Sequence, residues 1–300
     1  MTMAWRQFTM HLGALQPESV EAIFVRHGAS SVTLRDAGDN PVLEPGPGET
    51  PLWHDTTITG LFAASTDFDA LHDALQHELE IGSLPHIVIE DLEDRDWERE
   101  WLKDFQPMRF GERLWIYPTT TPPPDDDSVV IRLDPGLAFG TGTHATTALC
   151  LEWLDGLSLS GKALLDYGCG SGVLAIAGLK LGCRSATCMD IDPQAVIATL
   201  QNASDNQVID DLVVFGSADE IHGQFDVLVA NILAGPLVQF AESITLTLRG
   251  RGMLALSGVL CEQADDVMHA YEPWIDFEDP VFREQDGQIW SRLTGIRRTG

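Results

Sequence analysis

The stretch Ala163-Leu-Leu-Asp-Tyr-Gly-Cys-Gly-Ser-Gly-Val-Leu174 decides the fold of this 300-residue chain. Its apolar start predicts a buried strand, its three alternating glycines predict a sharp turn, and its apolar end predicts the beginning of a helix. Strand, glycine-rich turn and helix form the first unit of a nucleotide-binding α/β domain. Such a turn lets the backbone approach a ligand closely, and the helix N-terminus offers unpaired N–H groups.

A single acidic residue, Asp190, ends the next apolar strand, which is expected at residues 185–189. A carboxylate at this position can accept hydrogen bonds from both hydroxyls of a ribose. The G-x-G-x-x-G pattern of dinucleotide-binding domains fails here, because Val173 occupies the last glycine position. The pattern D-x-G-x-G-x-G instead resembles the first motif of the Rossmann-like methyltransferases, which bind S-adenosylmethionine. An NAD-dependent dehydrogenase and a turn without a ligand stay open as alternatives.

Composition indicates two folded domains without a membrane segment. The chain is 44% hydrophobic, and its 300 residues exceed the roughly 250 that one core usually reaches. No apolar run approaches the roughly twenty residues of a membrane span, and no secretory signal begins the chain. The five cysteines lack C-x-x-C spacing, so we expect a reducing, cytoplasmic environment and no metal site.

The charge of the chain is strongly negative. It has 46 acidic residues against 18 lysines and arginines, a net charge of −28. Such a surface repels phosphate backbones, so direct nucleic-acid binding is disfavoured, and it attracts basic partners. Composition alone favours the plainer explanation, which is solubility or a salt-adapted source.

The first 92 residues predict a small α+β domain. Periodicity places strands at 2–12, 31–35, 58–64 and 86–90, and helices at 17–27 and 67–80. The order β-α-β-β-α-β is the ferredoxin-like arrangement. Because it contains no recognisable catalytic group, we interpret residues 1–92 as a substrate-recognition domain. Residues 93–127 are expected to form a linker helix, with Trp97 and Trp101 on one face, and the entry to the second domain.

The last domain, residues 128–300, predicts an α/β fold with a mostly parallel, seven-stranded sheet. Buried strands are expected at 129–133, 163–166, 185–189, 212–215, 225–230 and 252–257. Residues 273–281 and 288–293, on either side of Asp286-Gly287, predict a terminal antiparallel hairpin. A parallel sheet that ends in an antiparallel hairpin is the methyltransferase topology.

Polar residues precede two of the predicted helices, and we assign some of them to capping and others to ligand binding. A threonine-rich loop leads to a helix expected from Thr146 to about Leu157, and His144 is interpreted as a loop or cap residue. Asp192, followed by proline, predicts the N-cap of a later helix, which leaves Asp190 as the ribose ligand. Asp219 is a weaker candidate for the adenine edge.

The end of the strand expected at 225–230, the fourth counted from the strand at 163–166, carries the candidate catalytic residue, Asn231. Methyl transfer from a sulfonium needs a neutral amine in the correct orientation, so positioning dominates. The Asn231 amide and the Ile232 carbonyl can accept N–H bonds without keeping the amine protonated. Amino-methyltransferases often carry N-P-P-Y here, whereas this chain has N-I-L-A, so Phe139 or another loop residue would replace the aromatic wall. A helix cap is the structural alternative for Asn231.

Five motifs together resemble the PrmA family, which methylates protein eleven of the large ribosomal subunit. They are Trp101–Phe110, Leu133–Thr147, Asp166–Gly172, Asp190–Pro193 and Asn231–Leu237. The resemblance implies S-adenosylmethionine as cofactor, S-adenosylhomocysteine as product, and methylation of lysine ε-amino groups and an α-amino group. It also implies an N-terminal domain that docks the substrate and swings relative to the catalytic domain.

The motif positions of the family supply site residues for this chain. Thr147, Gly168, Asp190 and Asn231 are the implied cofactor residues, to which the glycine turn adds Gly170. Phe139 and Thr143 are candidates on the substrate side, and Asn231 is the candidate for catalysis. A negative surface would favour a lysine-rich ribosomal protein as partner. We expect a monomer with no metal, no direct contact with nucleic acid and no membrane attachment.

Overall fold

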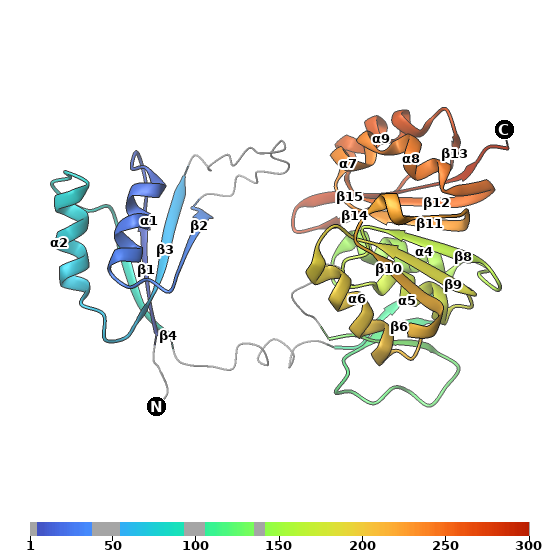
Figure 1. Ribbon diagram of the computed structural model, residues 1–300, viewed down its shortest axis with the longest axis horizontal. Coiled ribbons are helices and arrows are strands. Elements are labelled where there is room, and N and C mark those ends of the chain that lie inside the picture. The colour runs from blue at the N-terminus through green and yellow to red at the C-terminus, as the bar shows by residue number, and fades with distance from the viewer. Residues whose placement is uncertain (1–4, 38–54, 93–105, 135–141, 300) are drawn as a thin grey trace. The chain divides into compact units, whose positions relative to one another are not determined.

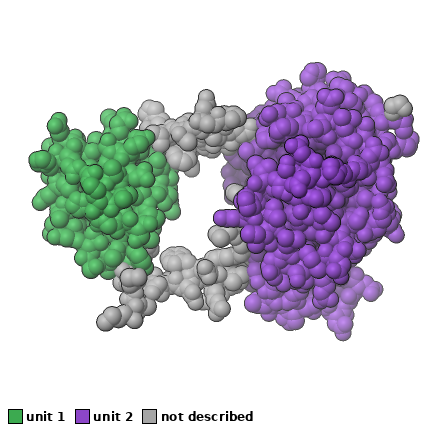
Figure 2. All heavy atoms as spheres, viewed as in Figure 1, with its two compact units in different colours: residues 1–100 green, residues 101–300 purple. Residues whose placement is uncertain are grey.

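The computed structural model describes residues 5–37, 55–92, 106–134 and 142–299. The chain divides into two compact units, Met1–Glu100 and Trp101–Gly300 (Figure 2). The domain ranges expected from the sequence, 1–92, 93–127 and 128–300, stay predictions. No helix among the described residues is long and apolar enough to cross a membrane.

The first unit is a four-stranded antiparallel sheet with two helices (Figure 1). Its elements are β1 (Trp5–His11), α1 (Pro17–Arg26), β2 (Ser31–Asp36), β3 (Thr56–Ala63), α2 (Phe68–Glu78) and β4 (Ile87–Leu92). The sheet order β2-β3-β1-β4 confirms the predicted ferredoxin-like arrangement. Three aromatic rings join the sheet to α1: Phe24 meets Phe8 at 5.5 Å and Phe62 at 5.6 Å, edge to face.

The second unit contains the predicted α/β sheet. Its strands are β8 (Ala163–Tyr167), β9 (Ser185–Met189), β10 (Leu212–Phe215), β11 (Phe225–Asn231), β12 (Leu248–Leu260), β13 (Ile275–Phe277), β14 (Val281–Gln285) and β15 (Gln288–Arg297). The order is β10-β9-β8-β11-β12-β15-β13, with β14 also paired to β15. Strands β8 to β12 run parallel and β15 runs antiparallel to its neighbours, as the sequence predicted.

Helices cover both faces of this sheet (Figure 1). They are α4 (Ala145–Asp155), α5 (Val173–Lys180), α6 (Pro193–Asp205), α7 (Ala234–Gln239), α8 (Ala241–Leu246) and α9 (Ala264–Tyr271), with short 3₁₀ turns at Ile209–Asp211, Ala218–Glu220 and Cys261–Gln263. Helices α4 and α5 share one apolar core, and α7, α8 and α9 share another. Because both faces are buried, β8 and β11 are apolar almost throughout, which made them easy to predict.

The terminal hairpin differs from the expectation in one respect. Of the strand predicted over 273–281, only Ile275–Phe277 forms β13, and a separate strand, β14, begins at Val281 and continues to Gln285; both pair with β15. Pro280 lies between them, and a proline has no N–H group for a strand ladder. The described sheet therefore has eight strands rather than seven. Asp286 and Gly287 both have positive φ, 52° and 75°, as a tight hairpin turn requires.

A second, three-stranded sheet precedes α4. It contains β5 (Met108–Phe110), β6 (Leu114–Tyr117) and β7 (Val129–Arg132) in that order. The sequence predicted β7 but not β5 or β6. Asn206, at the end of α6, binds β7 as a strand would: its Oδ1 accepts from Arg132 N and its Nδ2 donates to Arg132 O, both at 2.7 Å.

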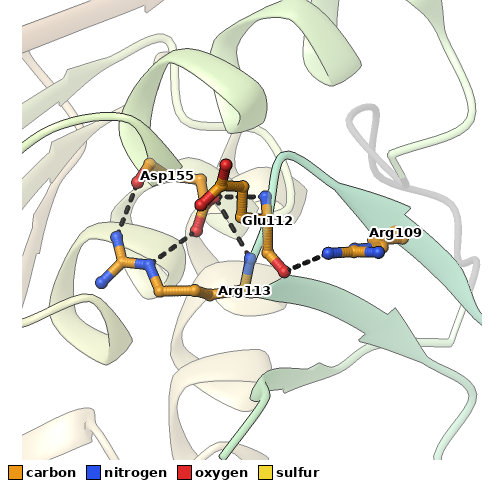
Figure 3. Close-up of polar contacts among 4 residues, drawn as sticks. All are labelled: Arg109, Glu112, Arg113 and Asp155. Atoms are coloured by element: carbon orange, nitrogen blue, oxygen red, sulfur yellow. Dashed lines mark hydrogen bonds and ion pairs between the residues drawn. The ribbon is translucent and has the colours of Figure 1, made fainter.

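Asp155, the last residue of α4, anchors the turn between β5 and β6 (Figure 3). Its buried Oδ2 accepts hydrogen bonds from the backbone N–H groups of Glu112 at 2.6 Å and Arg113 at 3.2 Å. The Arg113 Nε lies 3.3 Å from Asp155 Oδ1, and its Nη2 donates to the Asp155 carbonyl. Gly111, with φ +71°, is required here because a Cβ would lie 2.9 Å from Asp155 Cβ. One carboxylate thus joins the small sheet to the helix.

Replacing Asp155 with alanine is expected to lower the free energy of unfolding by about 3 kcal/mol. The change leaves two backbone N–H groups without their acceptor and removes the ion pair between the Asp155 carboxylate and Arg113. Urea unfolding measures the loss. Asp276→Ala is the control, because it removes an ion pair to Arg298 from a side chain that is 68% exposed and should cost less than about 1 kcal/mol. Equal losses in the two variants would contradict the anchoring role.

Candidate active site

A cavity of about 430 Å³ opens at the carboxyl ends of β8, β9 and β11. Its wall combines the glycine turn after β8, the acidic turn after β9 and the segment after β11, and Pro236 and Phe240 add apolar surface. Strand β8 lies between β9 and β11. After β8 the chain adds β9 and β10 on one side of β8 and then returns to add β11 and β12 on its other side, so the strand order reverses at β8. Open α/β sheets bind their ligands at this point.

The glycine turn needs residues without side chains. Gly168 has φ +76° and Gly170 has φ +55°, which is the left-handed region. A Cβ at Gly168 would also overlap Cγ2 of Ile232, from the loop after β11. Gly172, with φ +76°, is the N-cap of α5, where a Cβ would lie 2.7 Å from Thr199 Cγ2. Because these glycines have no side chains, the turn can pack closely against Ile232, after β11, and against Thr199, in α6.

Asp190 joins the two turns that line the cavity. Its Oδ2 accepts from Gly170 N at 2.8 Å, and its Oδ1 accepts from Asp192 N at 3.0 Å. Each carboxylate oxygen can accept a further bond, so ribose hydroxyls can still bind. Asp192 accepts from Gln194 N at 2.8 Å and caps α6, with Pro193 at the first helical position. The predicted cap role of Asp192 is confirmed.

Asp166, the motif's first residue, is buried below the glycine turn. Its Oδ2 accepts from Ala175 N, in the first turn of α5, at 3.1 Å. Its Oδ1 has no hydrogen-bond partner within the described residues. The pKa of this carboxyl is raised to about 7, chiefly by burial; the hydrogen bond from Ala175 lowers the pKa, and the negative Asp190 adds to the increase. The sequence predicts Asp166 only as the end of a strand, although an acidic residue next to an apolar run was a signal of a special role.

The raised pKa of Asp166 predicts a pH-dependent stability. The folded protein keeps a proton up to about pH 7, whereas the unfolded chain loses it near pH 4. The folded state therefore binds more protons over this interval, and its stability falls as pH rises. Asp166→Asn removes the titration, so the stability of the variant relative to the parent should rise by a few kcal/mol between about pH 4 and about pH 7 and stay constant above that. Parallel stability curves for the two proteins, measured by urea unfolding, would contradict this assignment.

Asn231, at the end of β11, lies in the cavity wall with an unsatisfied oxygen. Its Nδ2 donates to Thr147 Oγ1 at 3.2 Å. Its Oδ1 is buried and has no hydrogen-bond partner in the described part of the chain. Thr147 is itself buried and belongs to the first turn of α4. Of the residues expected to bind a cofactor, the wall contains Gly168, Gly170, Asp190 and Asn231 but not Thr147, which contacts Asn231 instead.

Ile232 is held between two glycines from neighbouring strands. Gly168 faces its side chain, and Gly258, from an irregularity in β12, faces its peptide group. Gly258 has φ +82°, and a Cβ there would lie 2.8 Å from the Ile232 carbonyl carbon and 3.0 Å from its nitrogen. Gly258 was not among the predicted site residues, although a lone glycine within a strand pattern indicates a close backbone approach.

His144 is the N-cap of α4, which confirms its interpretation as a cap residue. Its Nδ1 lies 2.8 Å from Thr146 Oγ1, and its ring meets the Trp290 ring edge to face at 4.6 Å. Burial lowers the pKa of His144, so the neutral ring is favoured. A neutral Nδ1 can accept from the Thr146 N–H group, which it faces at 3.4 Å.

Helix α4 is also held by the terminal hairpin. The Gln285 Oε1 accepts from Ala145 N at 2.5 Å, and Arg283 forms two bonds of 2.8 and 2.9 Å with the Glu152 carboxylate. The Arg292 side chain donates to the Leu149 carbonyl at 2.8 Å. These contacts fix the helix that supplies Thr147.

The remaining candidates lie apart from the cavity wall or outside the described residues. Thr143 is exposed one residue before the cap of α4, and Asp219 is exposed in a 3₁₀ turn after β10. Neither belongs to the described cavity wall. Phe139, Trp97 and Trp101 lie outside the described residues.

Comparison with known proteins identifies the family. The family model described as ribosomal protein L11 methyltransferase (PrmA) matches residues 4–298. The chain belongs to the PrmA family. A relative named ribosomal protein L11 methyltransferase, from Erwinia tasmaniensis, is 50% identical over 297 residues, which cover 99% of this chain and 100% of the relative. One of the same name from Shewanella amazonensis is 46% identical over 298 residues, with the same coverage.

A solved structure agrees with this PrmA assignment. It is described as a ribosomal protein L11 methylase from Lactobacillus delbrueckii subsp. bulgaricus, with 28% identity and a TM-score of 0.57. The match covers 65% of this chain and 99% of that chain. The PrmA resemblance that the motifs indicated is confirmed, and it extends over the first unit. Membership of a methyltransferase family excludes the dehydrogenase alternative.

Proposed function

We propose that the chain transfers methyl groups from S-adenosylmethionine to lysine ε-amino groups and the N-terminal α-amino group of ribosomal protein L11. Family membership supports the reaction class. The observation that carries the proposal is the Oδ1 of Asn231, a residue of the cavity wall, which is a buried acceptor without a hydrogen-bond partner among the described residues. Buried polar groups normally have a partner, and a donor from a bound molecule can supply one here. The N–H of an amine is such a donor.

The residues around the cavity fit S-adenosylmethionine. The positive φ of Gly168 and its contact with Ile232 leave a cradle that a Cβ would fill. We propose that backbone groups of Gly168 and Gly170 hold the methionine portion and that Asp190 binds the ribose. Ile191, 85% exposed at the cavity wall, offers apolar surface for the adenine. When bound, S-adenosylmethionine supplies an electrophilic methyl group on a positively charged sulfur.

The chain's own part in the reaction is to hold a neutral amine. The Asn231 oxygen would accept one N–H bond and direct the nitrogen, and orientation of this kind accounts for much of enzymatic rate enhancement. An amide carries no charge, so it does not stabilise the ammonium form as a carboxylate would. The apolar cavity side, with Pro236 and Phe240, also disfavours a charged amine.

We propose that the first unit docks the substrate protein. The sheet face opposite its core carries polar residues, among them Gln7 and Thr9 of β1, and Thr9 bonds Thr59 at 2.9 Å. A polar, folded surface of this kind suits a protein partner better than a small molecule. Ribosomal proteins are made in the cytoplasm, so we place the activity there, with the chain acting as a monomer.

Labelled S-adenosylmethionine tests the proposed function directly. The chain is incubated with unmodified L11 and, separately, with an unrelated lysine-rich protein of similar size. We expect label on L11 only, and mass spectrometry of its peptides should place the mass additions on lysines and on the N-terminus. Binding of S-adenosylhomocysteine without any transfer to L11 would reject L11 as substrate while leaving the methyltransferase class intact.

The net charge of −28 predicts a salt-dependent encounter with a basic substrate. Attraction between opposite charges speeds association, and salt screens it over about 10 Å at 0.1 M. The kcat/KM for L11 should fall at least about fivefold between ~50 and ~500 mM salt, while the Kd for S-adenosylhomocysteine changes little. Steady-state kinetics and calorimetry measure the two quantities. A kcat/KM that is independent of salt would contradict electrostatic steering.

A further inference from the structure

Strand β12 contains a bulge at the point where the neighbouring strand β11 ends. Its register with β15 shifts by one residue between Leu256 and Val259, so Ser257 and Gly258 stand opposite a single residue of β15. On the other side of β12, Ser257 pairs with Asn231, the last residue of β11. Gly258 has φ +82°, and a glycine of positive φ is typical of a bulge. Bulges often lie next to active sites, where they redirect the chain.

Two fully buried serines hold this bulge in place. The Ser257 hydroxyl donates to the Ser291 carbonyl of β15 at 2.8 Å. The Ser291 hydroxyl donates in the other direction, to the Val259 carbonyl of β12, at 2.9 Å. A buried hydroxyl that loses its acceptor is costly, so the two bonds oppose any change of register at the bulge. The position of Gly258 is therefore fixed from both strands.

Gly258 lies directly against the main chain of Ile232. A Cβ added to Gly258 would overlap the Ile232 carbonyl oxygen and would lie 2.8 Å from the carbonyl carbon. Because carbon atoms in contact are optimally about 3.5–4.0 Å apart, a side chain here would displace the Ile232 main chain by roughly 1 Å. The atoms in the way belong to the backbone, so no change of rotamer can remove the overlap.

The chain that Gly258 contacts belongs to the wall of the cavity, which includes Asn231, Ile232 and Leu233. We propose that Gly258 is a positioning residue for methyl transfer. Its missing side chain lets the Ile232 main chain lie against the bulge, and this contact sets the position of Asn231–Leu233 in the cavity wall. The inference rests on the proposed function, but not on which atom of this segment meets the amine. A misplacement of about 1 Å can slow an enzymatic reaction about 100-fold.

Two alanine variants with the same kind of backbone strain test this role. Gly258→Ala should lower kcat for methylation of L11 at least about tenfold. Gly161→Ala is the control, because Gly161 has φ +72° and no described atom lies within 4 Å of an added Cβ; its kcat should not change. The value of kcat is counted per molecule that binds S-adenosylhomocysteine, so unfolded protein does not enter it. Equal kcat in the two variants overturns the proposal.

The two glycines that face Ile232 should respond differently to a smaller side chain at residue 232. The Cβ of Gly168→Ala would overlap the Ile232 side chain, whereas that of Gly258→Ala would overlap its main chain. In an Ile232→Ala background, Gly168→Ala should therefore lose much of its effect on S-adenosylhomocysteine affinity, and Gly258→Ala should keep its effect on kcat. If Ile232→Ala also removes the effect of Gly258→Ala, the proposed main-chain contact is overturned.

A second variant decides the question if Gly258→Ala does not fold. Ser291→Ala removes the hydroxyl that bonds the Val259 carbonyl and adds no volume, so it should loosen the bulge and lower kcat at least about threefold. Thr245→Val is its control, because Thr245 is also fully buried and donates to the Ala241 carbonyl of its own helix at 2.7 Å. If both variants keep the kcat of the parent, the bulge does not position the site.

Nuclear magnetic resonance gives a readout that does not depend on turnover. The backbone amide resonances of Ile232 and Leu233 should shift in Gly258→Ala and in Ser291→Ala, and should stay unchanged in Gly161→Ala. Resonances that do not shift would overturn the proposal even if kcat fell. If the parent protein does not methylate L11, the proposed function fails, but these resonances still decide whether Gly258 sets the position of the wall segment.

Discussion

Replacing Gly168 with alanine is expected to weaken S-adenosylhomocysteine binding at least about 100-fold and to lower the unfolding free energy by about 3 kcal/mol. Two effects combine. An alanine at φ +76° is strained by about 1–2 kcal/mol, and its Cβ overlaps the Ile232 side chain, so the turn or the loop after β11 must move. Calorimetry measures the affinity and urea unfolding measures the stability.

Gly161 provides the matched control for this experiment. It has almost the same conformation, φ +72°, but no atom lies within 4 Å of the position of an added Cβ. Gly161→Ala should therefore cost only the backbone strain of about 1 kcal/mol and leave S-adenosylhomocysteine affinity unchanged. If both variants bound the product equally well, the contact between Gly168 and Ile232 would have no part in forming the site.

Replacing Asn231 with alanine is expected to lower kcat about 100-fold while the Kd for S-adenosylhomocysteine changes by less than about fivefold. The variant loses the oxygen that would orient the amine, an effect comparable to losing one positioned hydrogen bond in other enzymes. The backbone groups and the carboxylate proposed to hold the cofactor are unchanged. Steady-state methylation assays with L11 measure kcat, and calorimetry measures the Kd for S-adenosylhomocysteine.

Asn231→Asp tests the chemical reason for an amide. A carboxylate of the same shape raises the pKa of a neighbouring ammonium, because it stabilises the charged form. The methylation rate of Asn231→Asp should be low at neutral pH. It should rise with pH over a higher pH range than in the parent, because the substrate amine loses its proton at a higher pH. A pH–rate profile identical to that of the parent would exclude direct contact between residue 231 and the amine.

Much of the fold could be predicted because the sequence determines it locally. The apolar run Ala163–Leu165, the alternating glycines and Asp190 specify a strand, a turn and a strand end without information from distant residues. The ferredoxin-like order followed from periodicity in the same way. Strands β5 and β6 could not be predicted, because they are short and are stabilised by a carboxylate, Asp155, about forty residues later.

The sequence predicted residues of the candidate site but not the hydrogen bonds between them. Gly168, Gly170, Asp190 and Asn231 line one cavity, although their motifs are spread over the domain. The bond between Asn231 and Thr147 joins residues 84 positions apart, and no local pattern indicates it. The raised pKa of Asp166 could not be predicted from the sequence either, because it results from burial in the folded protein. The roles of these residues stay predictions until the variants are measured.

The bonds between the terminal hairpin and α4 have a consequence for synthesis of the protein. Residues 283–292 hold a helix that begins at Ala145, so the ribosome makes the helix long before the strands that fix it. Contacts this distant in sequence form late, after the intervening chain has been ordered. A nascent chain that stops before Val281 would contain every residue of the cavity wall yet lack the brace on Thr147. Enzymatic competence should therefore appear only after residues 283–292 have been synthesised and have reached the helix.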